Sequence, residues 1–282
     1  FGSTRYLPLA ATARLLGRRV VIIGGGYDVA AMPEIGYGNM SGGVSRRLGR
    51  TLFRLANVVA AFSVSAGDEV QRNAGVASRR IRVIPLGFDP ALGAAAPPFH
   101  SKRREVLTVG HINRSSLHRK GFMLTVRVAK LLTDVPFIIA GAAEPDALGL
   151  LRAEATPNVR FEGAVSVERL SELYALARVY LQPSRHEGFG AAVAEAMLHN
   201  CLPVVSRCGS LPEVVGNAGV YADATGDPQA WASAITIALD GPALGEEPRA
   251  RILATFPAER RQRQLLKLLR DLQDGGFDAA RS

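Results

Sequence analysis

The sequence contains few cysteines and no long apolar run. Its 282 residues include two cysteines, Cys201 and Cys208, whose spacing fits no metal-binding pattern, so we interpret both as packing residues. So few cysteines are typical of a reducing compartment, where disulfides do not persist. No stretch of about 18 or more apolar residues occurs, which excludes a membrane-spanning helix. The first residues do not resemble a signal peptide, because their cationic residues follow the apolar ones. We therefore expect a cytoplasmic protein.

Acidic residues are outnumbered by basic ones. The chain has 34 lysines and arginines against 25 aspartates and glutamates, which gives a net charge of +9. This charge suits three kinds of partner: nucleic acid, an anionic membrane surface or an anionic substrate. No nucleic-acid-binding motif occurs, and the basic residues are not interleaved with aromatic ones as on a base-stacking surface. An enzyme bound peripherally to anionic lipid on the inner membrane face fits better, although an arginine-rich genome would give the same charge.

One predicted helix is especially basic. Residues 44–56 are expected to form a helix whose outer positions carry Arg46, Arg47, Arg50 and Arg54. Most stripes of this kind are solvated faces. In an enzyme with a lipid-linked acceptor, however, the stripe can lie on a membrane surface. Both interpretations stay open.

Short apolar strands alternate with helices along the chain. The predicted strands cover residues 20–23, 58–65, 81–89, 106–109, 136–141, 159–165, 179–181 and 202–205. Glycine-bearing turns follow several of them, and this alternation is typical of parallel sheets in α/β proteins. Residues 91–98, ALGAAAPP, are small and proline-bearing, so we expect a linker there.

The most informative stretch runs from residue 180 to residue 215. The turn after the strand at 179–181 carries, in order, Glu187, Gly188, Phe189 and Gly190. A helix follows, and it begins with small residues. Such a helix exposes unpaired backbone N–H groups, and its dipole adds partial positive charge at the same end. The turn therefore predicts an anion site of the phosphate-binding kind.

Two acids near this turn indicate what else the ligand contains. A carboxylate is a poor ligand for phosphate, whereas it accepts strong hydrogen bonds from sugar hydroxyls. Glu187 stands at the mouth of the turn, and Glu195 follows about two helical turns later. Glu195 can hold a second set of hydroxyls, such as those of a ribose. A nucleotide sugar combines one anionic part with two hydroxyl-rich parts, and the pattern predicts it as the ligand.

A cluster of cations follows the strand at 106–109. The polar loop expected there carries His111, Arg114, His118, Arg119 and Lys120. Cations at the carboxyl end of a strand suit a diphosphate, which would lie opposite the helix that begins after Gly190.

These segments together resemble a known family. Glu187 and Glu195 stand within HEGFGAAVAEAM, and LPVVSRCGSLPEVVG, with Glu213 in its LPE turn, comes shortly afterwards. The stretch is similar to the signature of the family 4 retaining glycosyltransferases. The resemblance implies an α/β protein of the GT-B fold, in which two Rossmann-like domains face a cleft. It also implies retaining transfer of a sugar from a nucleotide sugar to a glycan or lipid-linked acceptor, as in polysaccharide biosynthesis, with neither a metal nor a cofactor.

The resemblance also implies a division of the chain. Residues 1–98 would be the N-terminal, acceptor-side domain with its linker, and residues 99–256 the C-terminal domain that binds the nucleotide sugar. Residues 257–282 would form a helix that crosses back toward the first domain. The first domain holds fewer predicted strands than the fold requires, so it reads as truncated. We favour a fragment over a reduced domain, because an open parallel edge is costly.

The donor-binding residues follow from the same resemblance. Lys120 matches the lysine of the family, whereas His111 stands where the family carries an arginine. Arg114 is the alternative for that contact, and the choice between the two stays open. Glu187 would orient the transferred sugar and Glu195 the ribose. The backbone of Gly188, Phe189 and Gly190 would neutralise the diphosphate, and the loop at Gly163 would contact the base.

On the acceptor side, one polar residue stands out. Asp28 follows the first predicted strand, in a loop at the carboxyl end where ligand crevices form. We assign it a catalytic, acceptor-side role beside Lys120 and Glu187. Its alternative role is that of a turn residue or helix cap.

Other functions remain possible on this fold. One is a nucleotide-sugar epimerase or a phosphorylase, although no motif supports the pyridoxal phosphate that such a phosphorylase needs. Another is a catalytically silent domain that binds a nucleotide sugar or a partner protein. No DxD-like pair of acids stands at a strand end, so we expect no metal site.

The assignments of the lysine and of the second acid can be tested. We expect Lys120→Ala to abolish transfer, because it removes the cation assigned to the diphosphate. Glu195→Ala should mainly weaken donor binding. Steady-state kinetics and donor titrations measure the two effects, and equal activity of Lys120→Ala and the wild type would contradict the phosphate assignment.

Overall fold

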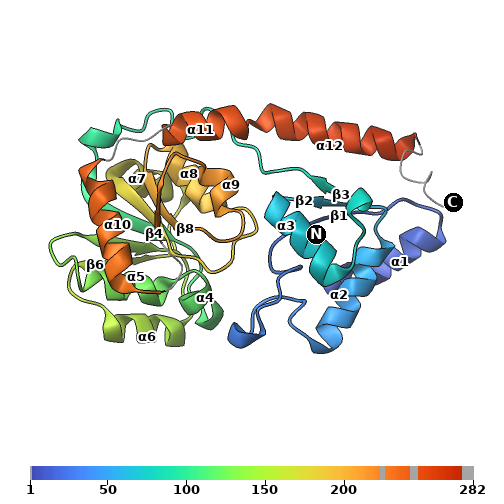
Figure 1. Ribbon diagram of the computed structural model, residues 1–282, viewed down its shortest axis with the longest axis horizontal. Helices are drawn as coiled ribbons and strands as arrows, with labels where there is room; N and C mark the ends of the chain where they lie inside the picture. Colours follow the sequence, from blue (N-terminus) through green and yellow to red (C-terminus); the bar gives the residue numbers. More distant parts are fainter. Residues whose placement is uncertain (1, 223–225, 242–246, 275–282) are drawn as a thin grey trace. The chain divides into compact units, whose positions relative to one another are not determined.

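The computed structural model describes residues 2–222, 226–241 and 247–274. The chain divides into two compact units, one formed by Phe1–Gly87 with Phe256–Ser282 and the other by Phe88–Thr255 (Figure 1). Each unit contains a parallel sheet flanked by helices. The expected α/β class is therefore confirmed.

The first unit is built on a short parallel sheet. Its strands, in spatial order, are β1 (Val21–Gly24), β2 (Val58–Ala61) and β3 (Ile81–Val83). Its α-helices are α1 (Leu7–Leu15), α2 (Gly43–Leu55), α3 (Val64–Glu69) and α12 (Ala258–Gln273). Every residue of β2 is buried, as expected for a parallel strand covered on both faces.

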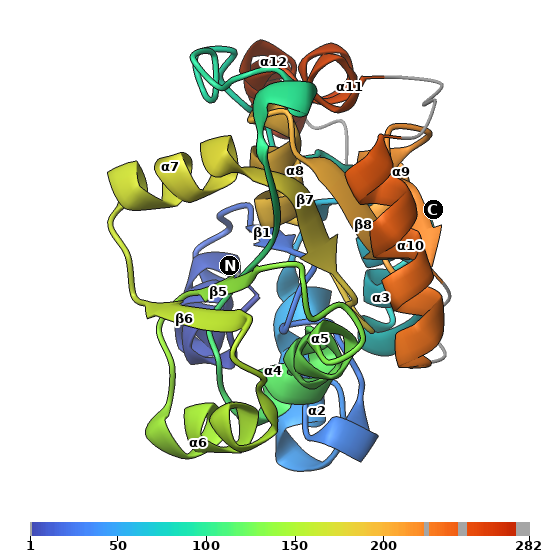
Figure 2. The same cartoon turned by 90° about the vertical axis from the view of Figure 1, so that its left-hand side faces the viewer.

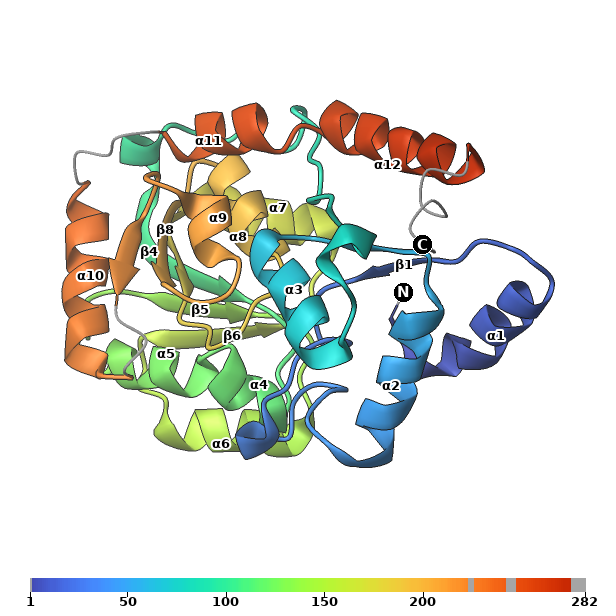
Figure 3. The same cartoon turned by 45° about the vertical axis from the view of Figure 1, so that its right-hand side comes forward.

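Alternating residues of β2 pack against different helices. Val58 belongs to a cluster with Leu268 and Leu272 of α12, whereas Val59 belongs to a cluster with Leu52 of α2. Successive side chains of a strand point to opposite faces, so α12 covers one face of this sheet and α2 the other (Figure 3).

Two strands of the first unit are shorter than the sequence predicts. The expected strand at 58–65 ends at Ala61, because the Ser63 side chain accepts a hydrogen bond from the Ala66 N–H and thereby begins α3. The strand expected at 81–89 ends at Val83, two residues before Pro85, which lacks the N–H that a ladder needs.

The second unit contains a six-stranded parallel sheet in the order β6-β5-β4-β7-β8-β9. The strands are β4 (Arg103–Val109), β5 (Phe137–Ala140), β6 (Val159–Gly163), β7 (Ala177–Gln182), β8 (Leu202–Ser206) and β9 (Val220–Ala222). The helices are α4 (Arg114–Arg119), α5 (Phe122–Ala129), α6 (Pro145–Glu154), α7 (Val167–Leu176), α8 (Ala191–Leu198), α9 (Leu211–Val215), α10 (Pro228–Asp240) and α11 (Pro248–Thr255).

The core of the second unit lies between the sheet and the helices on its two faces (Figure 2). On one face, Trp231 and Ile235 of α10 and Val128 of α5 pack against strand residues such as Val179. Tyr180 points to the opposite face of β7, where its ring lies 5.9 Å from the ring of Tyr174 of α7. Because helices cover both faces of the sheet, the polar side chains of a binding site can only gather at the ends of the strands.

The residues expected to form the linker, 91–98, lie inside the second unit. Arg249 of α11 donates hydrogen bonds to the carbonyl oxygens of Pro90 and Leu92, at 2.6 and 2.8 Å. Asn200 donates another to the carbonyl oxygen of Pro97, at 3.2 Å. These donors satisfy carbonyl groups that have no partner in a helix or strand. They thereby fix the segment to the rest of the second unit.

Within the described ranges, 2–222, 226–241 and 247–274, the chain forms no helix with the length and apolarity that crossing a membrane requires.

A lysine and a cysteine lie together in the interior of the second unit. The Lys102 side chain is buried, and its Nζ donates to the carbonyl oxygens of Tyr174, Ala175 and Ala177 at 2.6, 2.7 and 3.0 Å. These are carbonyl groups at the end of α7, where a helix leaves its acceptors unpaired. Burial lowers the pKa of Lys102. Burial likewise raises the pKa of the neighbouring Cys201 thiol to about 11.

This environment predicts very different reactivities for the two cysteines. At pH 8 a thiol-specific reagent should modify Cys208 quickly, while Cys201 should react only on unfolding, because it is fully buried and remains a thiol. Since the folded pKa of Cys201 lies above its ordinary value of 9.0, its contribution to stability is complete below about pH 9 and is lost as the pH rises toward 11. Mass spectrometry after timed labelling measures the rates.

The Cys208→Ser variant is the control, and it should lose the fast phase. Two fast thiols in the folded wild type would contradict the buried position of Cys201.

Candidate functional site

The centre of the six-stranded sheet is a topological switch point. β4 and β7 are neighbours, but the chain continues from β4 to β5 on one side and from β7 to β8 on the other. In open α/β sheets, ligands bind at the carboxyl ends of the strands at such a point, because the two connections leave it in opposite directions and open a crevice. The two segments that the sequence singles out, 110–121 and 183–190, begin there.

The first segment contains a short helix where the sequence predicts a loop. The Asn113 side chain accepts a hydrogen bond from the Ser116 N–H, while the Ser116 side chain accepts one from the Asn113 N–H, at 2.9 and 2.8 Å. This reciprocal capping begins α4. Arg114 and His118 stand four residues apart on this helix and so share a face, whereas His111 and Lys120 lie outside the helix.

Lys120 follows α4 and reaches the second segment. Its Nζ lies 3.3 Å from Oε1 of Glu187, and 19% and 12% of the two side chains are exposed, so the pair is largely shielded from water. A Cβ atom built on Gly110 would lie 3.0 Å from Cδ of Lys120. The glycine at the end of β4 therefore lets the lysine stem lie across the strand end.

The two segments are fixed to each other by the backbone. The Arg185 N–H donates to the carbonyl oxygen of Arg119 at 2.7 Å. Gly121 has a φ of +75°, and a Cβ atom there would lie 2.4 Å from the carbonyl oxygen of Pro183. Only glycine allows this approach, so the separation of Lys120 and Glu187 is set by packed backbone.

A third segment holds Glu187 from the other side. Ser210 donates two hydrogen bonds to the carbonyl oxygen of Glu187, from its N–H at 3.2 Å and from its hydroxyl at 3.1 Å. Gly209 has a φ of +54°, and a Cβ atom there would lie 2.5 Å from the same oxygen. The turn after β8 therefore fixes the position of the acid on the turn after β7.

The predicted anion site follows Glu187. Gly190 adopts a left-handed conformation, with a φ of +89°, immediately before α8, and no side chain caps this helix end. Phe189 is buried, and its ring stacks on that of Phe88 at 6.0 Å between centroids. Together with Gly188, these residues form the turn that the sequence assigns to a phosphate. The stacked ring anchors it.

The second acid lies on the same helix in a more apolar environment. Glu195 is partly buried on α8, and the Tyr174 hydroxyl donates to its Oε2 at 3.2 Å. Burial raises the pKa of Glu195, and the hydrogen bond from Tyr174 opposes part of that rise. Burial raises the pKa of the Tyr180 hydroxyl, and the charges of Glu187 and Glu195 add to this rise.

Three predicted donor residues contact groups other than Lys120 and Glu187. Arg114 is exposed, and its Nε pairs with Oδ2 of Asp146 on α6 at 2.7 Å. His111 is exposed beside Asn113, with its Nδ1 3.2 Å from the amide nitrogen. Gly163 ends the edge strand β6, and its carbonyl oxygen accepts a hydrogen bond from the Gly141 N–H at 2.8 Å.

Asp28 lies in the first unit, where its side chain stabilises a turn. Its Oδ1 accepts hydrogen bonds from the N–H groups of Gly25 and Gly26, at 3.1 and 2.8 Å. These bonds close the glycine turn after β1, which is the alternative role that the sequence left open.

Two further residues of the site were given no role from the sequence. Gln182 and Ser184 are buried and donate hydrogen bonds to Oε1 of Glu187, at 2.5 and 3.2 Å. A polar residue at the end of the otherwise apolar strand β7 was the available signal for Gln182. Among the described residues, no cluster of three or more histidines, cysteines and acids could hold a metal ion.

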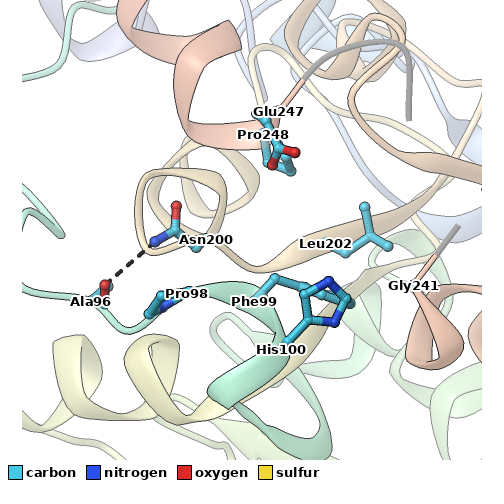
Figure 4. A pocket seen from close by; sticks show the side chains of 9 residues that line it. All are labelled: Ala96, Pro98, Phe99, His100, Asn200, Leu202, Gly241, Glu247 and Pro248. Carbon is cyan, nitrogen blue, oxygen red and sulfur yellow. Dashed lines mark hydrogen bonds between the residues drawn. The ribbon is translucent and has the colours of Figure 1, made fainter. Parts of the chain in front are cut away.

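A separate cavity of about 410 Å³ lies near the amino ends of β4 and β8, and Figure 4 shows the side chains that line it. It is lined by Ala96, Pro98, Phe99, His100, Asn200, Leu202, Gly241, Glu247 and Pro248. Leu202 begins β8, and Phe99 and His100 precede β4, so this cavity adjoins the amino ends of the strands. It is therefore not part of the Lys120–Glu187 site.

The sequence of the second unit matches a known family. Residues 103–240 match the model of a family described as glycosyl transferases group 1. Over 92 residues, covering 31% of the chain and 24% of the relative, the chain is 44% identical to O-antigen chain mannosyltransferase B of Escherichia coli. It is 28% identical over 222 residues to MMP alpha-(1->4)-mannosyltransferase of Mycolicibacterium hassiacum, covering 76% of the chain and 53% of the relative. The chain thus spans about half or less of these relatives.

Solved structures show the same fold. HepE of Anabaena, in complex with UDP and glucose, superposes with a TM-score of 0.78 at 19% identity, covering 95% of this chain and 76% of that one. Sucrose-phosphate synthase from Thermosynechococcus elongatus gives a TM-score of 0.76 at 22% identity, covering 96% and 73%. At these identities the likeness establishes the fold, which is the GT-B type predicted from the sequence.

The close approach of Gly209 to Glu187 gives a stability prediction. Gly209→Ala should destabilise the protein by about 1–3 kcal/mol, because the residue has a positive φ and its new methyl group would meet the Glu187 carbonyl oxygen. Thermal unfolding measures the loss.

Gly149→Ala is the matched control. Gly149 lies within α6 with nothing near its Cβ position, so alanine should leave stability unchanged or raise it by about 0.5–1 kcal/mol. An equal loss in both variants would contradict the special cost expected from the close contact between Gly209 and the Glu187 carbonyl oxygen.

Proposed function

Because the chain belongs, through residues 103–240, to the group 1 glycosyltransferases, we propose that it transfers a hexose from a nucleotide sugar to a glycan or lipid-linked acceptor. The observation that carries this proposal is the shielded Lys120–Glu187 pair at the switch point of the sheet. A cation suited to a diphosphate and an acid suited to sugar hydroxyls meet there, beside the uncapped start of α8.

In this proposal the donor's diphosphate lies between Lys120 and the turn of Gly188 to Gly190. As the bond to the sugar breaks, negative charge grows on the diphosphate. An ammonium group and a helix N-terminus already in place stabilise that charge without reorganising, which is often the largest catalytic contribution. Glu187 binds the transferred sugar, and Glu195 binds the ribose. The names of both curated relatives point to mannose, and the HepE complex points to UDP.

We further propose that transfer retains the configuration of the sugar and requires no metal. Lys120 supplies the positive charge that a divalent cation would otherwise bring to the diphosphate. The resemblance of the stretch from Glu187 to Glu195 to the retaining family supports the stereochemical assignment.

The acceptor side belongs, in this proposal, to the first unit. Arg46, Arg47 and Arg54 of α2 are exposed, and so are Val44 and Leu48 on the same helix. Basic and apolar side chains on one helix suit the surface of an anionic membrane, and this supports a lipid-linked acceptor at the cytoplasmic face.

The proposal can be tested first by binding. In a thermal-shift panel of UDP-, GDP- and ADP-sugars, one donor class should raise the apparent stability, by about 2.7 kcal/mol at one hundred times its dissociation constant. The corresponding free sugars are the control and should give no shift. Absence of a shift with every nucleotide sugar would contradict the proposed donor.

Turnover then separates the enzyme from a silent binding domain. With the donor found in the panel and a lipid or glycan extract, the wild type should release nucleoside diphosphate and form a product of retained configuration. Binding without turnover would favour the catalytically silent alternative.

A further inference from the structure

Three buried polar side chains lie directly behind Glu187. The Tyr180 hydroxyl donates to Oε1 of Gln182 at 2.9 Å, and Nε2 of Gln182 donates to the Ser184 hydroxyl at 3.1 Å. Both Gln182 and Ser184 then donate to Oε1 of Glu187, at 2.5 and 3.2 Å. The exposed fractions of Tyr180, Gln182 and Ser184 are 0%, 2% and 0%, so water does not compete for these bonds.

The period of the strand explains why these groups meet. Tyr180 and Gln182 stand two residues apart on β7, so they point to the same face of the sheet. Ser184 follows after Pro183, where the strand has ended, and its carbonyl oxygen accepts a hydrogen bond from the Ser206 hydroxyl at the end of β8. A buried polar network is stable when each member is satisfied, and these bonds satisfy it.

The hydrogen bonds from Tyr180 through Gln182 to Glu187 can donate in one direction only. If the Gln182 amide were reversed, its carbonyl oxygen would face the Glu187 carboxylate, and two acceptors would lie at hydrogen-bond distance. Burial raises the pKa of Tyr180 well above its usual range, so the hydroxyl keeps its proton and donates to Gln182. Tyr180 therefore holds the amide with its NH2 group directed at Glu187 and Ser184.

As a result, the two oxygens of Glu187 have different surroundings. Oε1 accepts from Gln182, Ser184 and Lys120, the last at 3.3 Å. Oε2 accepts no hydrogen bond from any residue in the described part of the chain. A carboxylate oxygen has room for about two acceptor sites, so the described residues saturate Oε1 and take up none of the capacity of Oε2.

We propose that Gln182 and Ser184 are positioning residues that bind Oε1 of Glu187 and thereby present Oε2 to a hydroxyl of the donor's sugar. This inference rests on the proposed function, because it requires a nucleotide-sugar donor. Oε1 also holds Lys120, whose ammonium has two further N–H bonds available for the diphosphate. One carboxylate thus sets the spacing between the group that binds the sugar and the group that binds the phosphate.

The inference predicts an effect on the sugar that is larger than the effect on the nucleotide. Gln182→Leu keeps the approximate volume and removes the donor to Glu187, so Oε2 is no longer held in place. A hydrogen bond to a charged group is strong enough that affinity or kcat for the nucleotide sugar should fall about tenfold to a hundredfold. The affinity for the free nucleoside diphosphate should stay within about twofold, because Gln182 does not contact that part of the ligand.

Calorimetric titration of each variant with the nucleoside diphosphate and with the nucleotide sugar measures this ratio, and steady-state kinetics divides the loss between kcat and KM. Gln229→Leu, at an exposed position at the start of α10 in the same unit, is the matched control and should change neither affinity. Ser184→Ala removes the second donor and should show a smaller loss of the same kind. It also provides the measurement if Gln182→Leu does not fold.

The possible results distinguish a failure of the positioning role from a failure of the proposed function. If the wild type binds the nucleotide sugar but Gln182→Leu and Ser184→Ala bind it equally well, the positioning role is wrong and the proposed function stands. If the variants lose both ligands to the same extent, the network has only a structural role, which also overturns the inference. If the wild type binds no nucleotide sugar, the proposed function fails first.

Discussion

The ion pair between Lys120 and Glu187 is the constraint on which the rest of the site depends. A charge pair with little exposure is stable only when further hydrogen bonds compensate for the lost hydration, and removing one partner leaves the other charge uncompensated. The buried donors behind Glu187 supply that compensation for the acid. The close glycine contacts at Gly121 and Gly209 fix the turns on which the pair stands. The close backbone contacts of these turns therefore fix the positions of the two charged residues.

The topology of the sheet brings this contact about. Lys120 and Glu187 are far apart in the chain, but they follow β4 and β7, which are neighbours at the point where the strand order reverses. Any residue at the carboxyl end of either strand faces the same crevice. By contrast, Gly163 is the last residue of β6 at the edge of the sheet, so it can contribute only to a ligand that extends across β5. An extended, three-part donor suits that spacing.

Much of this arrangement could be predicted from the sequence, because strand ends follow from apolar runs and glycine turns. The sequence placed the cation cluster opposite the turn that follows Glu187, but it did not predict the direct contact between Lys120 and Glu187. The start of α4 was not predicted either, since the Asn113 cap pairs with a serine and not with the usual glutamate. Nor could the sequence reveal the contact between Gln182 and Glu187, because it depends on how the turn after β7 folds back onto the end of the strand. The turn role of Asp28 was one of two open alternatives.

Arg114 pairs with Asp146 on α6, and this pairing bears on the proposed binding of a diphosphate. Its partner Asp146 is exposed, and the Arg114 guanidinium lowers the pKa of that carboxyl through a hydrogen bond. An ion pair in water is weak and is screened by salt, so little opposes the transfer of Arg114 from Asp146 to a diphosphate, whose charge is greater. Lys120 is different, because it is shielded and already held by Glu187. In the proposed function, the shielded lysine therefore marks the position of the diphosphate, and the exposed arginine is a second cation suited to strengthen its binding.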